Sequence, residues 1–378
     1  METNREAQHV SRIVIDAREY TTSTGRYMYR LLQYLDQIDT ATPSGHDYVI
    51  LLKPRDMSVY DFVSPRFSKV VCPHKEFSFD EQLGLLGQIK DLKPDLVHFG
   101  MVQQPIGYRG KVVTTMQDLT TIRFRNPSKN QLVFRLKQAV YKGVNKYVAR
   151  KSAAIITISE FVKQDLVQYT HAAPDKISVT YESADAIPDA AQPVDGLSGT
   201  RFIMYVGRPL PHKNLGRLID AYALLKLDHP DLQLVLAGKT DPLYEAHYDE
   251  VLNKQINGVV FTGFVSEGQL RWLYENCQAY VFPSLSEGFG LPGLEAIIHG
   301  APVVCSNATC LPEVYGDGAH YFDPLSIPDM SRAIAEVLDD SELRAALVGR
   351  GKIQVTKYSW LRMAQQTLAV YNDVLNSK

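Results

Sequence analysis

Two series of short apolar segments alternating with longer helical ones predict an α/β protein with two doubly wound, Rossmann-like domains. Three observations lead to this prediction. The chain of 378 residues is long enough for two domains, the alternation occurs in both halves, and an aperiodic stretch rich in Ala, Pro, Asp and Gly separates them at 183–200. Because such sheets bind ligands beyond the carboxyl ends of their strands, we expect a site in a cleft between the domains.

The first half contains short apolar runs that we predict as buried parallel strands. They cover residues 12–17, 48–52, 95–99, 111–116, 153–159 and 176–181. Helical periodicity is clear between several of them, at 26–37, 130–150 and 160–169. We assign these elements to an N-terminal domain of residues 1–190, followed by an interdomain linker.

The second half repeats the alternation. Strands are predicted at 201–207, 232–238, 259–263, 279–284, 301–306 and 319–323. Beyond residue 323 the pattern is helical to the end of the chain. We assign residues 200–358 to a C-terminal domain, so that each half forms its own parallel sheet.

Composition and charge exclude several classes of protein. The net charge of −2 favours no nucleic-acid partner, and 45% hydrophobic with 22% charged residues is typical of a soluble globular chain. Four cysteines without a C-x-x-C pair predict reduced thiols. The polar N-terminus has no apolar signal region, and no run approaches the roughly 20 apolar residues of a membrane span, so we expect a cytoplasmic location.

The stretch "YVFPSLSEGFGLPGLEAIIHGAPVV" (280–304) contains a G-x-G-x-x-G pattern at Gly288, Gly290 and Gly293. A dinucleotide-binding turn needs such glycines directly after a strand, early in the domain, and here "SLSE" intervenes. A flexible loop whose Pro292 starts a helix is the plainer interpretation. The pattern by itself therefore does not identify the ligand.

Two carboxylates flank these glycines and favour a third interpretation. Glu287 precedes the turn, and we expect Glu295 in the first turn of the following helix. Glycines let the backbone approach a ligand closely, and helix N-termini favour anions. Amide donors for a phosphate beside carboxylate acceptors for hydroxyls are the chemistry that a sugar nucleotide requires.

A second segment, "YVGRPLPHKNLGRLIDAY" (205–222), places two cations at a strand end. Arg208 follows the strand, and Lys213 lies in the loop before the next helix. Converging on one diphosphate, they would neutralise the charge of a leaving group. The alternative is two solvated surface cations, which is the usual situation of a lone Arg or Lys.

Together these motifs resemble the retaining glycosyltransferases of the GT-B fold, family GT4. "EGFGLPGLEA" has the E-x7-E pattern of that family, and the similarity extends in order over nearly the whole chain. Further similar segments are "TSTGRYMYRLLQYL" (22–35), "MQDLTTIRFRNP" (116–127), "ITISEFVKQDLV" (156–167) and "SNATCLPEVYGDGAHYFDP" (306–324). The resemblance implies an acceptor-side N-terminal domain, a donor-side C-terminal domain, and a last helix, 359–378, that packs back on the N-terminal domain.

The resemblance also implies roles for individual residues. It assigns Glu287 to the donor sugar and Glu295 to the nucleotide ribose. It assigns Arg208 and Lys213 to the diphosphate, and Gly25 to a loop that closes over the phosphates. The amides that would line the sugar and diphosphate are those of Gly288, Phe289, Gly290 and Leu291. Neither metal nor organic cofactor is implied, in keeping with a sequence that contains no D-x-D motif.

One position departs from the family pattern. Where the family commonly has a histidine before Asp118, this chain has Gln117. A glutamine amide can hydrogen-bond a sugar hydroxyl but cannot carry a proton charge. Gln117 either keeps the family role through hydrogen bonding or is a strand-end residue without one. We expect Asp118 to orient its loop or contact the acceptor.

The predicted activity is a retaining, metal-independent hexosyl transfer to a glycan or lipid-linked acceptor in polysaccharide biosynthesis. GDP-mannose is the first choice of donor, and a UDP-hexose is the alternative, because no residue identified here reads the base. A non-catalytic two-domain sugar-binding protein is the alternative from another class. A nicotinamide oxidoreductase using 288–293 is the weaker one.

A basic stretch, 123–151, contains Lys and Arg but no Asp or Glu, with apolar residues at helical spacing. A basic amphipathic helix can rest on anionic lipid, which would make the protein peripheral at the inner face of a membrane. A surface helix with its apolar face on the sheet explains the same stripe equally well. Both interpretations remain open at this level.

Overall fold

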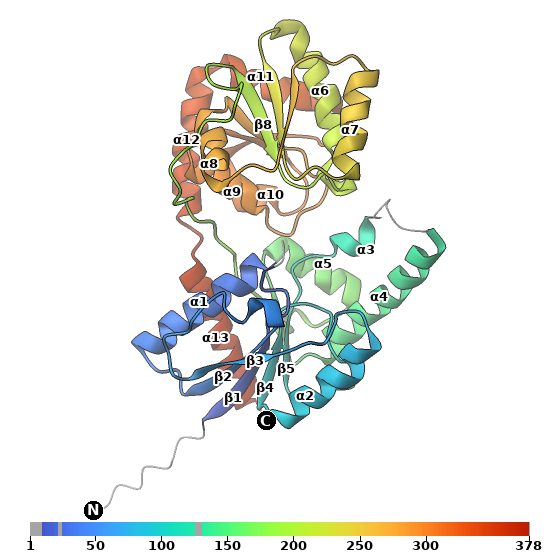
Figure 1. The fold of residues 1–378 in the computed structure, drawn as a ribbon, viewed down its shortest axis with the longest axis vertical. Coiled ribbons are helices and arrows are strands. Elements are labelled where there is room, and N and C mark those ends of the chain that lie inside the picture. The colour runs from blue at the N-terminus through green and yellow to red at the C-terminus, as the bar shows by residue number, and fades with distance from the viewer. Residues whose placement is uncertain (1–9, 22–24, 125–130, 378) are drawn as a thin grey trace, which may run out of the picture. The chain divides into compact units, whose positions relative to one another are not determined.

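The computed structural model describes residues 10–21, 25–124 and 131–377, with side chains from residue 138 onward in the helix that spans 131–151 (Figure 1). The chain divides into two compact units. Unit 1 contains the described residues of 1–122, 130–182 and 359–378, and unit 2 those of 123–129 and 183–358. Each unit has one parallel sheet with helices on its faces, which confirms the predicted α/β class.

Unit 1 has a seven-stranded sheet in the order β3-β2-β1-β4-β5-β6-β7, with every neighbouring pair parallel. The strands are β1 (Ser11–Asp16), β2 (His46–Leu52), β3 (Phe67–Val71), β4 (Leu96–Phe99), β5 (Val112–Thr115), β6 (Ala154–Thr157) and β7 (Ile177–Val179). All the predicted strands are present. The sequence did not predict β3, because this edge strand is largely accessible and lacks a continuous apolar run.

The helices of unit 1 cover both faces of its sheet. α1 and α13 lie on one face, and α2, α4 and α5 lie on the other, as right-handed crossovers require (Figure 1). Their bounds are α1 (Arg26–Ala41), α2 (Leu86–Asp91), α4 (Gln131–Lys151), α5 (Glu160–Thr170) and α13 (Trp360–Asn376), with the short α3 (Thr120–Arg123), η1 (Pro54–Asp56), η2 (Glu81–Leu85) and η3 (Pro174–Lys176) between them.

The last helix, α13, returns to unit 1 and packs beside α1, as the resemblance implies. His98 on β4 forms a buried hydrogen bond of 2.6 Å between its Nδ1 and the hydroxyl of Tyr371. Burial lowers the pKa of His98 to about 3, so the ring is neutral. The Lys111 ammonium donates to the carbonyls of Val374 and Leu375, at 2.9 Å each, and satisfies the helix C-terminus.

Unit 2 has a six-stranded parallel sheet in the order β10-β9-β8-β11-β12-β13. Its strands match the predicted ones: β8 (Phe202–Val206), β9 (Gln233–Ala237), β10 (Val259–Gly263), β11 (Ala279–Phe282), β12 (Val303–Ser306) and β13 (Ala319–Phe322). The helices are α6 (Leu215–Asp228), α7 (Pro242–Asn253), α8 (Glu267–Asn276), α9 (Leu291–Ile298), α10 (Leu311–Tyr315), α11 (Ile327–Asp339) and α12 (Ser341–Val355), with η4 (Pro211–Lys213) and η5 (Gly316–Gly318).

The aperiodic stretch 183–200 contains no helix or strand but is not a free linker. The Gln192 amide donates to the carbonyl of Gly268 at 3.0 Å, and the Ile187 amide donates to His299 Nε2 at 3.0 Å. Leu197 is buried. The boundary between the units therefore falls after residue 182 rather than between 190 and 200, because this segment satisfies its polar groups on unit 2.

Candidate functional site

The candidate site of unit 2 lies at the carboxyl ends of its two central strands. β8 and β11 are neighbours, with β9 and β10 to one side and β12 and β13 to the other. The strand order therefore reverses between β8 and β11, which is where ligands bind in doubly wound sheets. The segments 207–214 and 283–290, which carry most of the predicted donor residues, follow these two strands.

Hydrogen bonds tie these two segments together. The Leu285 amide donates to the carbonyl of His212 at 2.7 Å. The buried Asn214 donates from Nδ2 to the carbonyls of Pro283, at 3.0 Å, and Pro324, at 2.8 Å. Asn214 has a φ of 63°, a left-handed conformation that asparagine tolerates better than most residues. The sequence analysis missed Asn214, whose position just before a helix was the available signal.

Lys213 and Glu287 form the central ion pair of the site. Lys213 Nζ lies 2.6 Å from Glu287 Oε1, with the two side chains 19% and 12% exposed. The ammonium also lies 5.5 Å from the ring centroid of Phe282, and the Glu287 amide donates to Thr309 Oγ1 at 3.2 Å. The structure thus brings a cation and a carboxylate from different segments together at the switch point, within reach of solvent.

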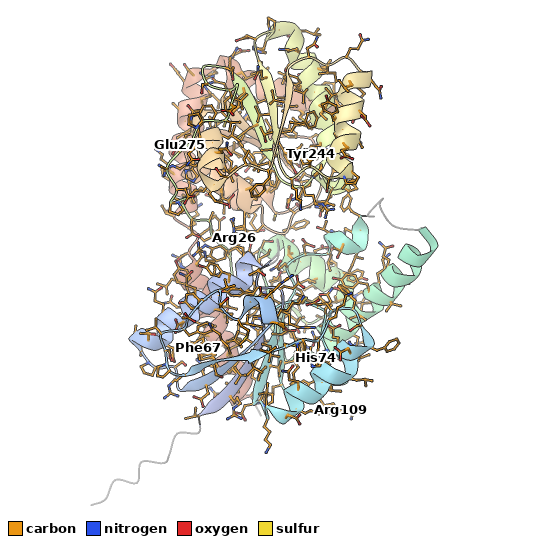
Figure 2. All side chains as sticks on the ribbon, viewed as in Figure 1. Arg26, Phe67, His74, Arg109, Tyr244 and Glu275 are labelled. Carbon is orange, nitrogen blue, oxygen red and sulfur yellow. The ribbon has the colours of Figure 1, made fainter. Side chains whose placement is uncertain are left out.

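Arg208 pairs with a carboxylate of unit 2. Its Nε donates to Asp241 Oδ2 at 2.8 Å, and its side chain is 61% exposed. Asp241 also caps α7, since Oδ1 accepts from the amides of Leu243 and Tyr244, the latter labelled in Figure 2. Burial alone raises the pKa of Asp241, but these donors outweigh it and hold the pKa below its ordinary value. Convergence of Arg208 and Lys213 on one diphosphate stays a prediction.

The glycine turn has a packing role that the sequence did not show. Gly290 precedes α9 with a φ of 94°, and its carbonyl accepts from the hydroxyl of Tyr315. A Cβ at Gly290 or at Gly293 would overlap the Tyr315 side chain. These two glycines therefore accommodate a buried tyrosine, which gives the second and third glycines of the G-x-G-x-x-G pattern a packing role that involves no dinucleotide. The neighbouring Phe289 is buried edge-on against Tyr358, with 5.3 Å between ring centroids.

The predicted position of Glu295 is wrong by one turn of helix. α9 begins at Leu291, so Glu295 is in the second turn, and the first turn contains no acidic residue. Its carboxylate is largely buried and accepts from the hydroxyl of Tyr274 at 3.4 Å. A ligand that contacts the Glu295 carboxylate therefore meets it at the second turn of α9 and not at the N-terminus of the helix.

In unit 1, Gly25 stands just before α1 in the segment that follows β1. A Cβ there would overlap the carbonyl groups of Glu19 and Tyr20, so the close backbone approach requires glycine. The residues immediately before it, 22–24, lie outside the described part of the chain. That this segment closes over the phosphates of the donor stays a prediction.

Gln117 and Asp118 follow β5, and both are partly buried. Asp118 Oδ1 accepts from the amide of Thr120 at 2.8 Å and so supports the start of α3. The buried Glu182, which the sequence analysis missed, interacts electrostatically with Asp118 and Arg26. The pKa of Glu182 is raised to about 7, mainly by burial; Arg26 opposes this shift, and Asp118 adds a smaller contribution in the same direction as burial. An acidic residue soon after an apolar strand was the signal in the sequence.

The described residues contain no group of three or more His, Cys, Asp or Glu that could hold a metal ion. The four cysteines are free thiols, all buried. Among the helices that the structure describes, none combines the length and apolarity needed to cross a bilayer.

Two parallel-sheet, Rossmann-like units of this topology match the GT-B fold of solved glycosyltransferase structures. The family model described as Glycosyltransferase Family 4 matches residues 24–186, and the model described as Glycosyl transferases group 1 matches residues 191–354. The chain is 30% identical over 276 residues to O-antigen chain mannosyltransferase B of Escherichia coli, covering 69% of this chain and 70% of that protein. The chain belongs to this family: it is a GT4, mannosyltransferase-like glycosyltransferase.

Further comparisons agree with this assignment. The chain is 32% identical over 240 residues to the serotype-specific mannosyltransferase WbdA of Escherichia coli, covering 60% of this chain and 29% of that longer protein. Sucrose-phosphate synthase from Thermosynechococcus elongatus has the same fold, with a TM-score of 0.73 at 17% identity over 96% of this chain and 98% of that one. Anabaena Alr3699/HepE, solved with UDP and glucose, has a TM-score of 0.68 at 17% identity over 96% and 100%.

Proposed function

We propose that this glycosyltransferase moves mannose from GDP-mannose, with retention and without a metal ion, to a glycan or lipid-linked acceptor in polysaccharide biosynthesis. The observation that carries the proposal is the Lys213–Glu287 pair at the switch point of unit 2. The names of the mannosyltransferase relatives, two of which concern O-antigen chains, support mannose and a polysaccharide product. A UDP-hexose is the alternative donor, since HepE was solved with UDP and glucose.

In this proposal the donor exchanges partners with the ion pair. A phosphate oxygen takes the place of the carboxylate at Lys213, and Glu287 then accepts from a hydroxyl of the donor sugar. Within the described residues, only Nε of the Arg208 guanidinium is engaged, so the remaining edge can bind the diphosphate. The two cations then stabilise the departing nucleotide in the role that a metal fills elsewhere. Glu295 is assigned to the ribose, and the amides of 288–291 to the sugar and diphosphate.

The proposed step uses positioning and charge rather than a protein nucleophile. The bond between the anomeric carbon and the phosphate oxygen breaks, while the acceptor hydroxyl forms its bond on the same face and passes its proton to the leaving phosphate. Once the donor has displaced it from Lys213, Glu287 is assigned to a hydroxyl of the donor sugar, so it is not the attacking group. Such a step needs the leaving group to be neutralised in place, which the cations provide.

We assign acceptor binding to unit 1. Asp118 orients the segment after β5 or contacts the acceptor, and Gln117 hydrogen-bonds a sugar hydroxyl. Gly25 permits the backbone approach that a phosphate-closing segment needs.

We further propose that the protein rests on the inner face of a membrane through 123–151. On α4 the exposed cations Lys142, Lys146 and Arg150 support this contact. The side chains of Arg125, Lys129, Arg135 and Lys137 belong to the same proposal but lie outside the described ones.

The experiment that tests the transferase proposal is a hydrolysis and transfer screen over GDP- and UDP-sugars in the presence of a chelator. We expect turnover with GDP-mannose and a fall of about 10²- to 10³-fold in kcat for Glu287→Gln. The matched control is Glu336→Gln, which removes an exposed carboxylate of α11 and should leave kcat unchanged. Undiminished turnover in Glu287→Gln would remove Glu287 from the site, and sugar binding without any turnover would favour the sugar-binding alternative.

A further inference from the structure

Unit 1 exposes several large apolar side chains on one short segment, 77–83. Phe77, Phe79 and Leu83 are 75%, 90% and 73% exposed. Single exposed apolar residues are ordinary, but a contiguous group of them usually marks a site of interaction. This segment therefore calls for a partner that covers it.

The segment is fixed to the protein core and does not hang free. The Phe77 amide donates to Glu81 Oε2 at 3.2 Å, and Ser78 Oγ accepts from the Glu81 amide at 3.2 Å. The other oxygen of Glu81 pairs with the fully buried Arg18 at 2.9 Å. Phe77 also adopts a φ of 57°, which is unfavourable for a bulky residue. The fold thus holds the aromatic side chains outward, at a cost in backbone strain.

The apolar surface continues onto neighbouring elements. The Phe77 ring lies 6.4 Å from that of Tyr141 on α4. The Ile106 amide donates to the Gln82 side chain at 3.0 Å, and the hydroxyl of Tyr147 donates to the Ile106 carbonyl at 3.1 Å. In Figure 1, α2 and α4 lie on the same side of the sheet. We call the exposed side chains the aromatic surface: Phe77, Phe79, Leu83, Ile106, Val140 and Tyr147.

Positive charge borders the aromatic surface. Lys142, Lys146 and Arg150 are exposed on α4, and the sequence has no Asp or Glu from 119 to 159. The one exposed carboxylate of the segment itself, Asp80, lies 2.9 Å from Nδ1 of His74, which is labelled in Figure 2. Apolar anchors beside a row of cations complement a bilayer with anionic headgroups. A second copy of the chain is a poorer occupant, because its own cations would face these.

We propose that the aromatic surface docks on an anionic bilayer, with Phe77, Phe79 and Leu83 at the headgroup–acyl boundary and the α4 cations on lipid phosphates. This docking depends on the proposed function, because a protein that modifies a lipid-linked acceptor has to work at the membrane surface. It moves the main apolar anchor from α4 to the segment 77–83. The binding itself requires neither nucleotide nor turnover.

The test is co-sedimentation of the full chain with phosphatidylcholine vesicles, with and without phosphatidylglycerol, at low and high salt. We expect binding to the anionic vesicles only, and a loss of at least about tenfold in partitioning for the double variant Phe77→Ser/Phe79→Ser. Lys142→Gln/Lys146→Gln should lose binding at low salt, where charge is least screened. The matched control is Leu227→Ser/Phe264→Ser in unit 2, whose residues are 79% and 82% exposed, and it should bind as the unmodified chain does.

Three outcomes would overturn the proposal. The first is that anionic vesicles do not retain the unmodified chain, and the second is that the Phe77/Phe79 variant binds as well as the control. The third is that the chain self-associates in ultracentrifugation through Phe77 and Phe79 without binding vesicles, which would make the surface an interface between copies. Hydrolysis of the nucleotide sugar without vesicles should be equal in the Phe77/Phe79 variant and the unmodified chain. Vesicle binding without any turnover would keep this surface and count against the transferase proposal.

Discussion

Units 1 and 2 each carry an arginine at the second position after the first strand of the sheet, next to the point where the strand order reverses. In unit 1, Arg18 is fully buried and pairs with Asp16 at 2.7 Å and Glu81 at 2.9 Å. In unit 2, Arg208 is mostly exposed and engages Asp241 through Nε alone. The same position therefore holds a structural ion cluster in one unit and a candidate ligand group in the other.

Burial and the number of partners explain this difference. Two carboxylates accept from Nε and Nη2 of the buried Arg18, and the His74 carbonyl accepts from Nη1 at 3.4 Å, so a ligand would have to replace desolvated hydrogen bonds. Arg208 keeps an open edge in contact with water, and binding there costs little desolvation. A switch point thus provides a location for a ligand site, and solvent access decides whether the charged side chains there can bind a ligand.

We expect the largest effect from a substitution that removes the cation of the buried cluster. Arg18→Met leaves two carboxylates without their cation, so we expect a loss of about 3–5 kcal/mol in the stability of unit 1. The matched variant Arg208→Met should cost less than about 1 kcal/mol. Hydrogen exchange followed separately for the amides of each unit measures both. Equal losses in the two variants would remove the distinction between the two arginines.

Next comes the pH dependence that Glu182 imposes on unit 1. Its folded pKa of about 7 lies above the reference value of 4.5, so the folded state holds the proton more tightly than the unfolded one. Stability therefore falls as the pH rises from about 4.5 through 7, by about 3 kcal/mol once the carboxyl is fully ionised. Glu182→Gln should be more stable than the unmodified chain at pH 8 and equal to it at pH 4. Denaturation curves that coincide for Glu182→Gln and the unmodified chain at both pH values would contradict the burial of this carboxyl.

Removing the paired cation of unit 2 should have a smaller effect, and on binding rather than stability. Lys213→Ala deletes a charged donor to the proposed diphosphate, so we expect the Kd for GDP or UDP to rise about 10- to 100-fold. Arg332→Ala, an exposed cation of α11 in the same unit, serves as the matched control. Calorimetry on both variants decides the matter, and an unchanged Kd in Lys213→Ala would place the diphosphate elsewhere.

The smallest expected effect concerns Asp241, which we expect to orient Arg208. Asn can replace Asp as a helix cap, so Asp241→Asn should leave α7 intact while removing the charge that holds Nε. We expect the Kd for the nucleoside diphosphate to rise about fivefold, with binding of the unphosphorylated nucleoside unchanged. A diphosphate Kd that falls in this variant would mean that Asp241 competes with the ligand.

Predictions from the sequence succeeded where a buried element produces a continuous apolar run in the sequence. The runs "RIVIDA" and "RFIMYVG" were recognised because the central strands β1 and β8 are covered on both faces and must be apolar. The edge strand β3 has no such run and was missed. Of the site, Lys213 and Glu287 were predicted and lie together, whereas Asn214 and Asp241 were not predicted. Their roles depend on partners distant in the chain, and no spacing reveals those.

The amino-acid sequence alone determined the two-sheet architecture and the family, because apolar runs and ordered motifs are local properties that can be recognised in the sequence itself. Only the tertiary structure decided which of two similarly placed arginines is dry and which faces water. It also decided that the glycines of 290–293 accommodate Tyr315, and that the aromatic residues of 77–83 point outward. The reason is that solvent access results from the packing of segments far apart in the chain, and a residue's immediate neighbours do not specify it.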